Sequence, residues 1–119
     1  KRALKLYRGP LLAAEEEAHW AIAPRARLQK AAHKIVMEVG MWYESSGKWN
    51  KAIRVYRSGL NKNAVDEQVW RHLMLCYQRS GRDEDALASY QQCCRELKEK
   101  LARNPSAKTK ILAESIVQH

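Results

Sequence analysis

The pattern of apolar, small and turn-forming residues repeats with a step of 34 positions through the middle and the second half of the chain. At this step bulky apolar residues align with bulky apolar residues, and glycine aligns with glycine. A unit of this length cannot bury its own apolar face, so neighbouring units must stack to share a core. The step therefore predicts stacked helix pairs. It links Val39 with Leu73, Tyr43 with Tyr77, Ser46 with Ser80, Gly47 with Gly81, Ala52 with Ala86, Ile53 with Leu87 and Tyr56 with Tyr90.

Helix-breaking and capping residues divide this pattern into separate helices. Pro24 favours the first turn of a long helix, because its missing N–H is not needed there. Asp66 and Ser106 each precede an apolar run, so we expect them as helix N-caps. The end of an earlier helix is expected over residues 2–7, before Gly9-Pro10. The later helices are predicted over residues 24–46, 48–60, 66–80, 83–103 and 106–117.

The period and its residues are similar to those of tetratricopeptide repeats. The second copy contains W-x2-L-x3-Y from Trp70, then Gly81, then A-x3-Y from Ala86. Gly47 and Gly81 stand where a helix must end and reverse, in a left-handed conformation that glycine adopts without a Cβ clash. The predicted fold class is all-α, with tetratricopeptide-like antiparallel helix-pair repeats in a right-handed superhelix. At this length we expect a single domain over residues 1–119.

The composition indicates a basic protein in a reducing environment. The net charge of +9 favours acidic partners, whether protein or nucleic acid. No apolar run approaches the roughly 20 residues that cross a membrane, and no cleavable signal is visible, so we expect a cytoplasmic protein without a membrane partner. Cys76, Cys93 and Cys94 form no C-x-x-C pair, which favours free thiols. The sequence does not begin with Met, and we expect a fragment of a longer protein.

Five short motifs, in this order along the chain, carry a family resemblance. They are L-x-L-Y-R-G-P-L-L at residues 4–12, P-R-x-R-L at 24–28 after Trp20, G-R-x2-D-A-L-x2-Y at 81–90, R-x-L-x3-L at 95–101, and P-S-x2-T-x2-L at 105–112. Together they resemble the bacterial transcriptional activator domain, a helical-repeat module of the antibiotic regulatory protein class. The resemblance covers nearly the whole chain.

This resemblance implies a regulatory and protein-interaction domain of a bacterial transcription regulator. It implies action through dimerisation, contact with RNA polymerase, or coupling to other domains of the same regulator. In such proteins a separate winged-helix domain reads DNA, and no winged-helix segment is recognisable in this chain. The repeat alone leaves an alternative open, a generic tetratricopeptide scaffold or adaptor with no role in transcription. The segment that precedes this one in the parent protein distinguishes the two hypotheses.

Two surfaces are candidates for binding. One is a basic stripe on the predicted helix 48–60, where no acidic residue lies between Glu44 and Asp66. It can contact phosphates without reading sequence, or it can be a solvated outer face. Its members are Lys48, Lys51, Arg54, Arg57 and Lys62.

The other candidate is the inner face of the first helix of each pair, where such repeats usually bind proteins. Exposed Met and Leu beside Arg suit a protein surface. The alternative is that a neighbouring helix, such as the last one, covers this face. Its members are Lys34, Met37, Met41 and Glu44 in the first copy, and Gln68, Arg71, Leu75 and Arg79 in the second.

Catalytic and metal-binding patterns are weak throughout the sequence. His72 and Cys76 share a predicted helix face, but no C-x-x-C or H-x3-H supplies the further ligands that zinc needs. Residues 46–48 faintly resemble a phosphate-binding loop, but Trp49 stands where Ser or Thr is required. No H-E-x-x-H or G-x-S-x-G motif occurs. We therefore expect no cofactor, no metal site, no catalytic residue and no enzymatic activity.

Overall fold

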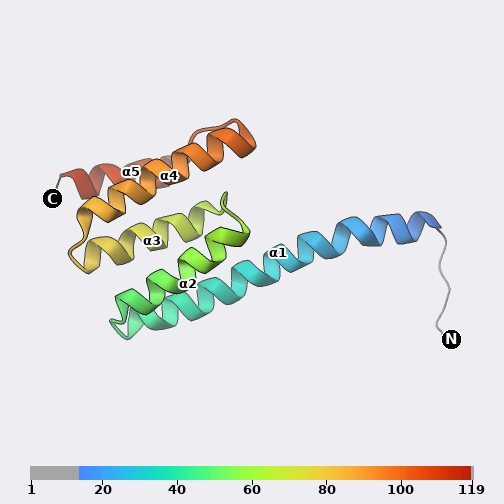
Figure 1. Cartoon of the computed structure of the whole chain (residues 1–119), viewed down its shortest axis with the longest axis horizontal. Helices are drawn as coiled ribbons and strands as arrows, with labels where there is room; N and C mark the ends of the chain where they lie inside the picture. The colour runs from blue at the N-terminus through green and yellow to red at the C-terminus, as the bar shows by residue number, and fades with distance from the viewer. Residues whose placement is uncertain (1–13, 119) are drawn as a thin grey trace. The chain divides into compact units, whose positions relative to one another are not determined.

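Five α-helices occupy most of residues 14–118, the part of the chain that this computed structural model describes, with side chains from residue 27 onward (Figure 1). The helices are α1 (Ala14–Ser45), α2 (Trp49–Lys62), α3 (Glu67–Arg79), α4 (Asp83–Leu101) and α5 (Ala107–Val117). They pack in sequential antiparallel pairs: α3 contacts both α2 and α4, and α5 contacts both α4 and α3. The predicted all-α class is confirmed.

The chain forms two units, residues 1–31 and residues 32–119. The described part of the first unit is the beginning of α1, and its side chains at residues 27–31 are exposed. The second unit contains the remainder of α1 and the four other helices. The single domain over residues 1–119 and the right-handed superhelix stay predictions.

The predicted boundaries of the last four helices agree with the structure to within two residues. The predicted start of the long helix at Pro24 is wrong, because α1 begins at Ala14 and Pro24 lies inside it. The segment before Pro24 is rich in Ala and Glu, which are strong helix formers and extend the helix toward the N-terminus. The expected helix end at residues 2–7 and the Gly9-Pro10 break lie outside the described residues.

Two glycine turns, one in each helix pair, close in the same way. Gly47 has φ +73° and Gly81 has φ +80°, which confirms the predicted left-handed conformation. After the first turn the Lys48 N–H donates to the Tyr43 carbonyl at 2.9 Å. The equivalent bond after the second turn runs from Arg82 to Tyr77 at 2.7 Å. The 34-residue step in the sequence is therefore a repeat of backbone geometry.

A cluster of buried apolar side chains extends through the second unit. Both small repeat residues, Ala52 and Ala86, are fully buried, as is Tyr56. The Trp70 indole is also buried, and its N–H donates to the Ala64 carbonyl at 2.7 Å. This bond satisfies the polar atom of a large core side chain, as burial of an indole requires. Most of the bulky and small repeat residues thus pack the core, as the sequence predicts, but Val39 is exposed.

Two glycines mark a close approach between α1 and α2. A Cβ atom placed on Gly40 would lie 2.3 Å from the Tyr56 ring, and one on Gly59 would lie 2.9 Å from the Val36 side chain. Real Cβ atoms do not approach other atoms so closely. The two helices are in contact at these positions, and glycine fits there because it has no Cβ atom. The equivalent positions of the second pair, Met74 and Cys93, carry buried side chains.

Replacing Gly40 by Ala is expected to destabilise the chain by about 1–3 kcal/mol. Alanine favours a helix by about 1 kcal/mol over glycine, but the added methyl group meets a ring that is fully buried and cannot move aside. Urea unfolding followed by circular dichroism measures the change. In a Tyr56→Leu background the penalty of Gly40→Ala should shrink. An equal penalty in both backgrounds would show that this contact is not its cause.

Candidate interaction surfaces

The face predicted for protein binding divides into exposed and buried residues. Met37 is only 6% exposed and belongs to the core, so it does not contribute to a surface in this structure. The exposed members are Lys34, Met41, Gln68 and Arg79, and the half-buried members are Glu44, Arg71 and Leu75. Only the four exposed residues can meet a partner without rearrangement.

Glu44 is the centre of a polar network that joins three helices. Its carboxylate accepts a hydrogen bond from the Tyr56 hydroxyl of α2 and lies 2.8 Å from His72 Nδ1 of α3. A carboxylate only accepts hydrogen bonds, so His72 carries a proton on Nδ1. The His72 and Tyr56 rings also lie 5.7 Å apart between centroids. Glu44 therefore holds α1, α2 and α3 together and is not available as a free binding group.

This network shifts the ionisation of its members. Burial raises the pKa of Glu44, but the hydrogen bonds from His72 and Tyr56 outweigh it, so the pKa lies below its usual value. Burial and the adjacent Glu44 carboxylate both raise the pKa of Tyr56. Glu44 is therefore ionised and Tyr56 neutral at physiological pH, which is the arrangement that a phenol–carboxylate hydrogen bond needs.

The last helix covers part of the predicted face. Glu67 accepts hydrogen bonds from the Thr109 hydroxyl and from the Ser106 backbone N–H, both at 2.8 Å. Arg71 donates to the Thr109 hydroxyl at 3.1 Å, and Arg103 lies 3.6 Å from the other Glu67 oxygen. Arg71 and Glu67 of α3 thus anchor the start of α5. The alternative that the last helix covers this face is correct for this part of it.

Asp66 and Ser106 occupy N-cap positions, but neither side chain makes the capping bond that the sequence predicts. The Asp66 carboxylate contacts His33 Nδ1 of α1, and His33 Nε2 lies 3.1 Å from the Gln68 amide oxygen. At α5 the capping acceptor is Glu67, from another helix. Tertiary partners compete with local caps for the same groups, so the local capping rule failed at both positions.

The Glu67 anchor predicts a pH dependence of stability. Burial raises the pKa of Glu67, but the bonds from Ser106 and Thr109 outweigh it and hold the pKa below its usual 4.5. Because the folded pKa is lowered, this stabilisation is complete above the unfolded pKa and is lost as pH falls through the folded value. Glu67→Gln should therefore cost about 1–2 kcal/mol at neutral pH and should weaken the loss of stability below about pH 4.5.

Urea unfolding at neutral pH and at about pH 3.5, on the native chain and on Glu67→Gln, measures this effect. Glu99→Gln is the matched control, because Glu99 is an exposed carboxylate on α4. An acid-induced loss of stability as large in Glu67→Gln as in the native chain would contradict the assignment.

An apolar stripe on α1, not predicted from the sequence, is exposed. Ile35 is 62% exposed, Val39 38% and Trp42 58%. A step of 34 residues leads from these positions to Val69, Leu73 and Cys76 on α3, which are 2%, 0% and 0% exposed. The 34-residue step itself could have revealed the stripe, because equivalent positions call for equivalent burial. Exposed side chains of this size on one helix face indicate a surface that another element covers.

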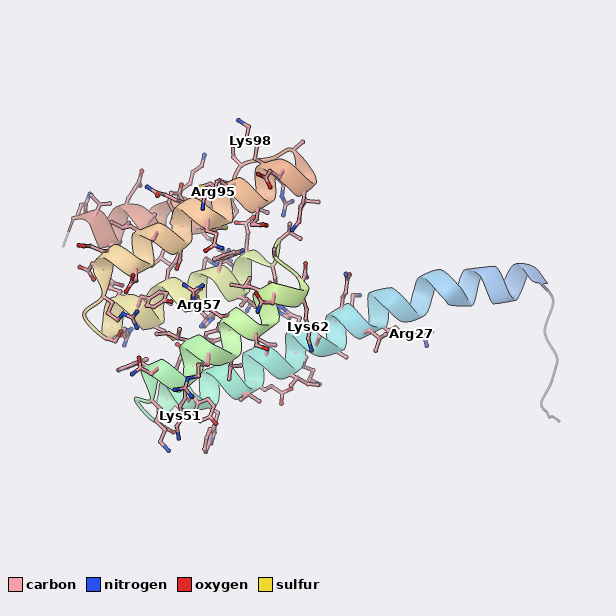
Figure 2. The ribbon with its side chains drawn as sticks, viewed as in Figure 1. Arg27, Lys51, Arg57, Lys62, Arg95 and Lys98 are labelled. Atoms are coloured by element: carbon pink, nitrogen blue, oxygen red, sulfur yellow. The ribbon has the colours of Figure 1, made fainter. Side chains whose placement is uncertain are left out.

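All five residues of the predicted basic stripe are exposed. Lys48 Nζ lies 5.9 Å from the centre of the Trp42 ring, and Lys51 Nζ lies 5.9 Å from that of Tyr43. Arg57 donates to the Tyr77 hydroxyl at 2.8 Å. Figure 2 shows Lys51, Arg57 and Lys62 along α2, and two cations that the prediction omitted on α4 in the same view, Arg95 and Lys98.

A shallow hollow of about 200 Å³ lies between α2 and α4. Trp70 contributes to its wall, and Arg57 and Lys100 bring positive charge to it. Glu96, on the same wall, forms an ion pair with Lys100 at 3.1 Å. The remaining lining residues are Leu60, Asn61, Ala64 and Gln92. The hollow shows that α2 and α4 border one groove on the surface.

The surroundings of the cysteines and histidines of the second unit indicate structural roles. Burial raises the pKa of Cys76 and that of Cys93 to about 12, so both thiols stay protonated. His72 Nδ1 bonds to Glu44, so this nitrogen is not available for a metal ion shared with Cys76. Among the described residues, no three His, Cys, Asp or Glu side chains gather as a metal site requires.

Comparison with known proteins identifies one family. The model of the bacterial transcriptional activator domain matches residues 1–117, nearly the whole chain. Neither the curated proteins nor the solved structures contain a match to this sequence. Among residues 14–118, no helix combines the length and the apolar character needed to cross a bilayer.

Proposed function

The chain belongs to the bacterial transcriptional activator domain family, and from this premise we propose that it is the regulatory, protein-interaction domain of a bacterial transcription regulator. The family consists of regulatory domains of transcription activators and is not a catalytic one. The domain acts in the cytoplasm through protein contacts, beside a separate domain that reads DNA. Its candidate partners are a second copy, RNA polymerase and the other domains of the regulator.

The observation that supports protein contact is the apolar stripe Ile35, Val39 and Trp42 of α1. On α3 the equivalent side chains are buried, and α3 has a helix on each side, α2 and α4. By the same repeat logic, the element that covers the α1 stripe is a helix. Completely burying an exposed side chain of this size contributes about 1.5–3 kcal/mol, so the stripe can form the apolar centre of a contact.

The spacing of the stripe favours a second copy as the partner. Ile35, Val39 and Trp42 follow each other at steps of four and three residues, so they lie on one face of α1. When two α1 helices pair in antiparallel fashion about a twofold axis midway between residues 38 and 39, Ile35 of each copy meets Trp42 of the other, and the two Val39 side chains lie near the axis. A surface that complements itself in this way is the signature of a twofold dimer.

The exposed members of the predicted inner face, Lys34, Met41, Gln68 and Arg79, form a second and smaller contact surface in this proposal. Met41 is 50% exposed and supplies the apolar part. Glu44 belongs to the polar network and Arg71 holds α5 in place, so neither is free to contact a partner. The surface is therefore discontinuous. It supports contact with other domains of the regulator rather than a deep peptide groove.

Sedimentation equilibrium of the chain should show a monomer–dimer equilibrium. The triple variant Ile35→Ser/Val39→Ser/Trp42→Ser should be monomeric with unchanged helix content, because these side chains contribute little to the core of the second unit. The matched control is Ile111→Ser/Val117→Ser, which removes equally exposed apolar side chains from α5 and should leave the dimer intact.

A chain that stays monomeric up to roughly 0.1 mM, where even weak contacts form, would contradict self-association. Photo-crosslinking from Val39 in the intact regulator then decides between the remaining partners. A crosslink to polymerase would replace the second copy as the partner. The absence of any protein crosslink from Val39 would overturn this surface as a contact site.

A further inference from the structure

Some cations of the second unit pair with carboxylates, and others do not. Arg71, Arg82, Lys100 and Arg103 each pair with a carboxylate, at 2.7 to 3.9 Å. The cations along α2 and on the middle of α4 form no ion pair with any carboxylate among residues 27–118. These are Lys51, Arg54, Arg57, Lys62, Arg95 and Lys98, and all six are exposed. Their charge is uncompensated within the described residues.

The two helices that carry these charges border the hollow described above. The hollow between α2 and α4 is lined from both sides, by Arg57 of α2 and by Gln92 of α4 among others. Helix α2 contains no acidic residue over its whole length. Figure 2 shows Arg57 and Lys62 on α2 and Arg95 and Lys98 on α4 in one view. Of the six cations, Arg57 lines the hollow itself, and the other five are exposed on the two helices that border it.

The chemistry of this groove fits a polyanion better than a folded protein. Protein contacts depend on exposed aromatic or aliphatic anchors at their centre. None of the large exposed apolar side chains lies on α2, and the only one on α4 is Leu101, at its last position. A phosphate backbone needs only a row of cations.

The spacing of the row also suits a phosphate backbone. From Lys51 to Lys62 the helix rises by roughly 16 Å, at about 1.5 Å per residue. Phosphates of one DNA strand follow each other every 3.4 Å or so along the axis, so this row spans roughly five of them. Arg57 is held in place by its hydrogen bond to the Tyr77 hydroxyl, which limits the ordering cost of binding.

We propose that Lys51, Arg54, Arg57, Lys62, Arg95 and Lys98 bind the phosphate backbone of duplex DNA without reading its sequence. The domain then adds affinity next to the site that a separate domain selects. This proposal keeps four of the five cations of the basic stripe, leaves out Lys48, and adds Arg95 and Lys98 on a second helix. It is independent of the apolar contact on α1, because the two surfaces share no residue.

Fluorescence anisotropy with a labelled random-sequence duplex of about 20 base pairs tests it. The logarithm of the affinity of the 119-residue chain should fall linearly with the logarithm of salt concentration, with a slope of about −0.9 per phosphate contact. Neutralising three cations in Lys51→Gln/Arg54→Gln/Lys62→Gln should make the slope less steep by about 2.7 and weaken binding on the order of 100-fold at about 0.1 M salt.

The matched control removes the same charge elsewhere. Lys30→Gln/Lys108→Gln/Lys110→Gln neutralises three exposed lysines on α1 and α5 and should change the slope far less. Equal effects of the two triple variants would show that net charge alone drives binding and would overturn the proposal. So would the absence of binding at about 50 mM salt, where phosphate contacts are strong. Equal binding of a polyglutamate chain of the same charge would assign the groove to acidic protein instead. Circular dichroism of each variant confirms that it is folded.

Discussion

The contact on which the rest of the fold depends is the one between the Gly40 backbone and the Tyr56 ring. It brings α1 and α2 so close that no side chain fits between them. At this distance the Tyr56 hydroxyl reaches Glu44, and the same carboxylate reaches His72 on the next helix. One close approach therefore aligns three helices. Because Glu44 is half-buried, its two partners must both be in place to offset its desolvation.

Most helix boundaries followed from the sequence, and at two of the four turns between the described helices a glycine marks the boundary through its local physics. Gly47 and Gly81 adopt the conformation that few other residues tolerate, so their role did not depend on the rest of the fold. Pro24 misled for the opposite reason. Proline is tolerated at a helix start but does not enforce one, and the Ala- and Glu-rich segment before it continues the helix to Ala14. Asp66 occupies the predicted N-cap position of α3, but its carboxylate bonds to a histidine on α1 and does not cap the helix.

The surfaces were only partly predictable. Helical periodicity alone placed the α2 cations on one exposed face, because the charged face of an amphipathic helix lies opposite the face that packs on the core. It could not show that Met37 is buried while Met41, one turn later, is half exposed, because that depends on which side α2 and α3 occupy. Nor could it show that Arg71 is committed to α5. The α1 stripe required a comparison between repeats, not a pattern within one helix.

The two unpartnered surfaces of the second unit differ in the physics of what they attract. Burial of the α1 stripe rests on the hydrophobic effect, which added salt does not weaken and some salts strengthen. Contacts of the α2 and α4 cations with phosphate release counterions and weaken steeply as salt rises. A regulatory domain built on both can hold a protein partner continuously while it contacts DNA reversibly. The exposed apolar side chains and the uncompensated cations lie on different residues of the unit, so one contact need not disturb the other.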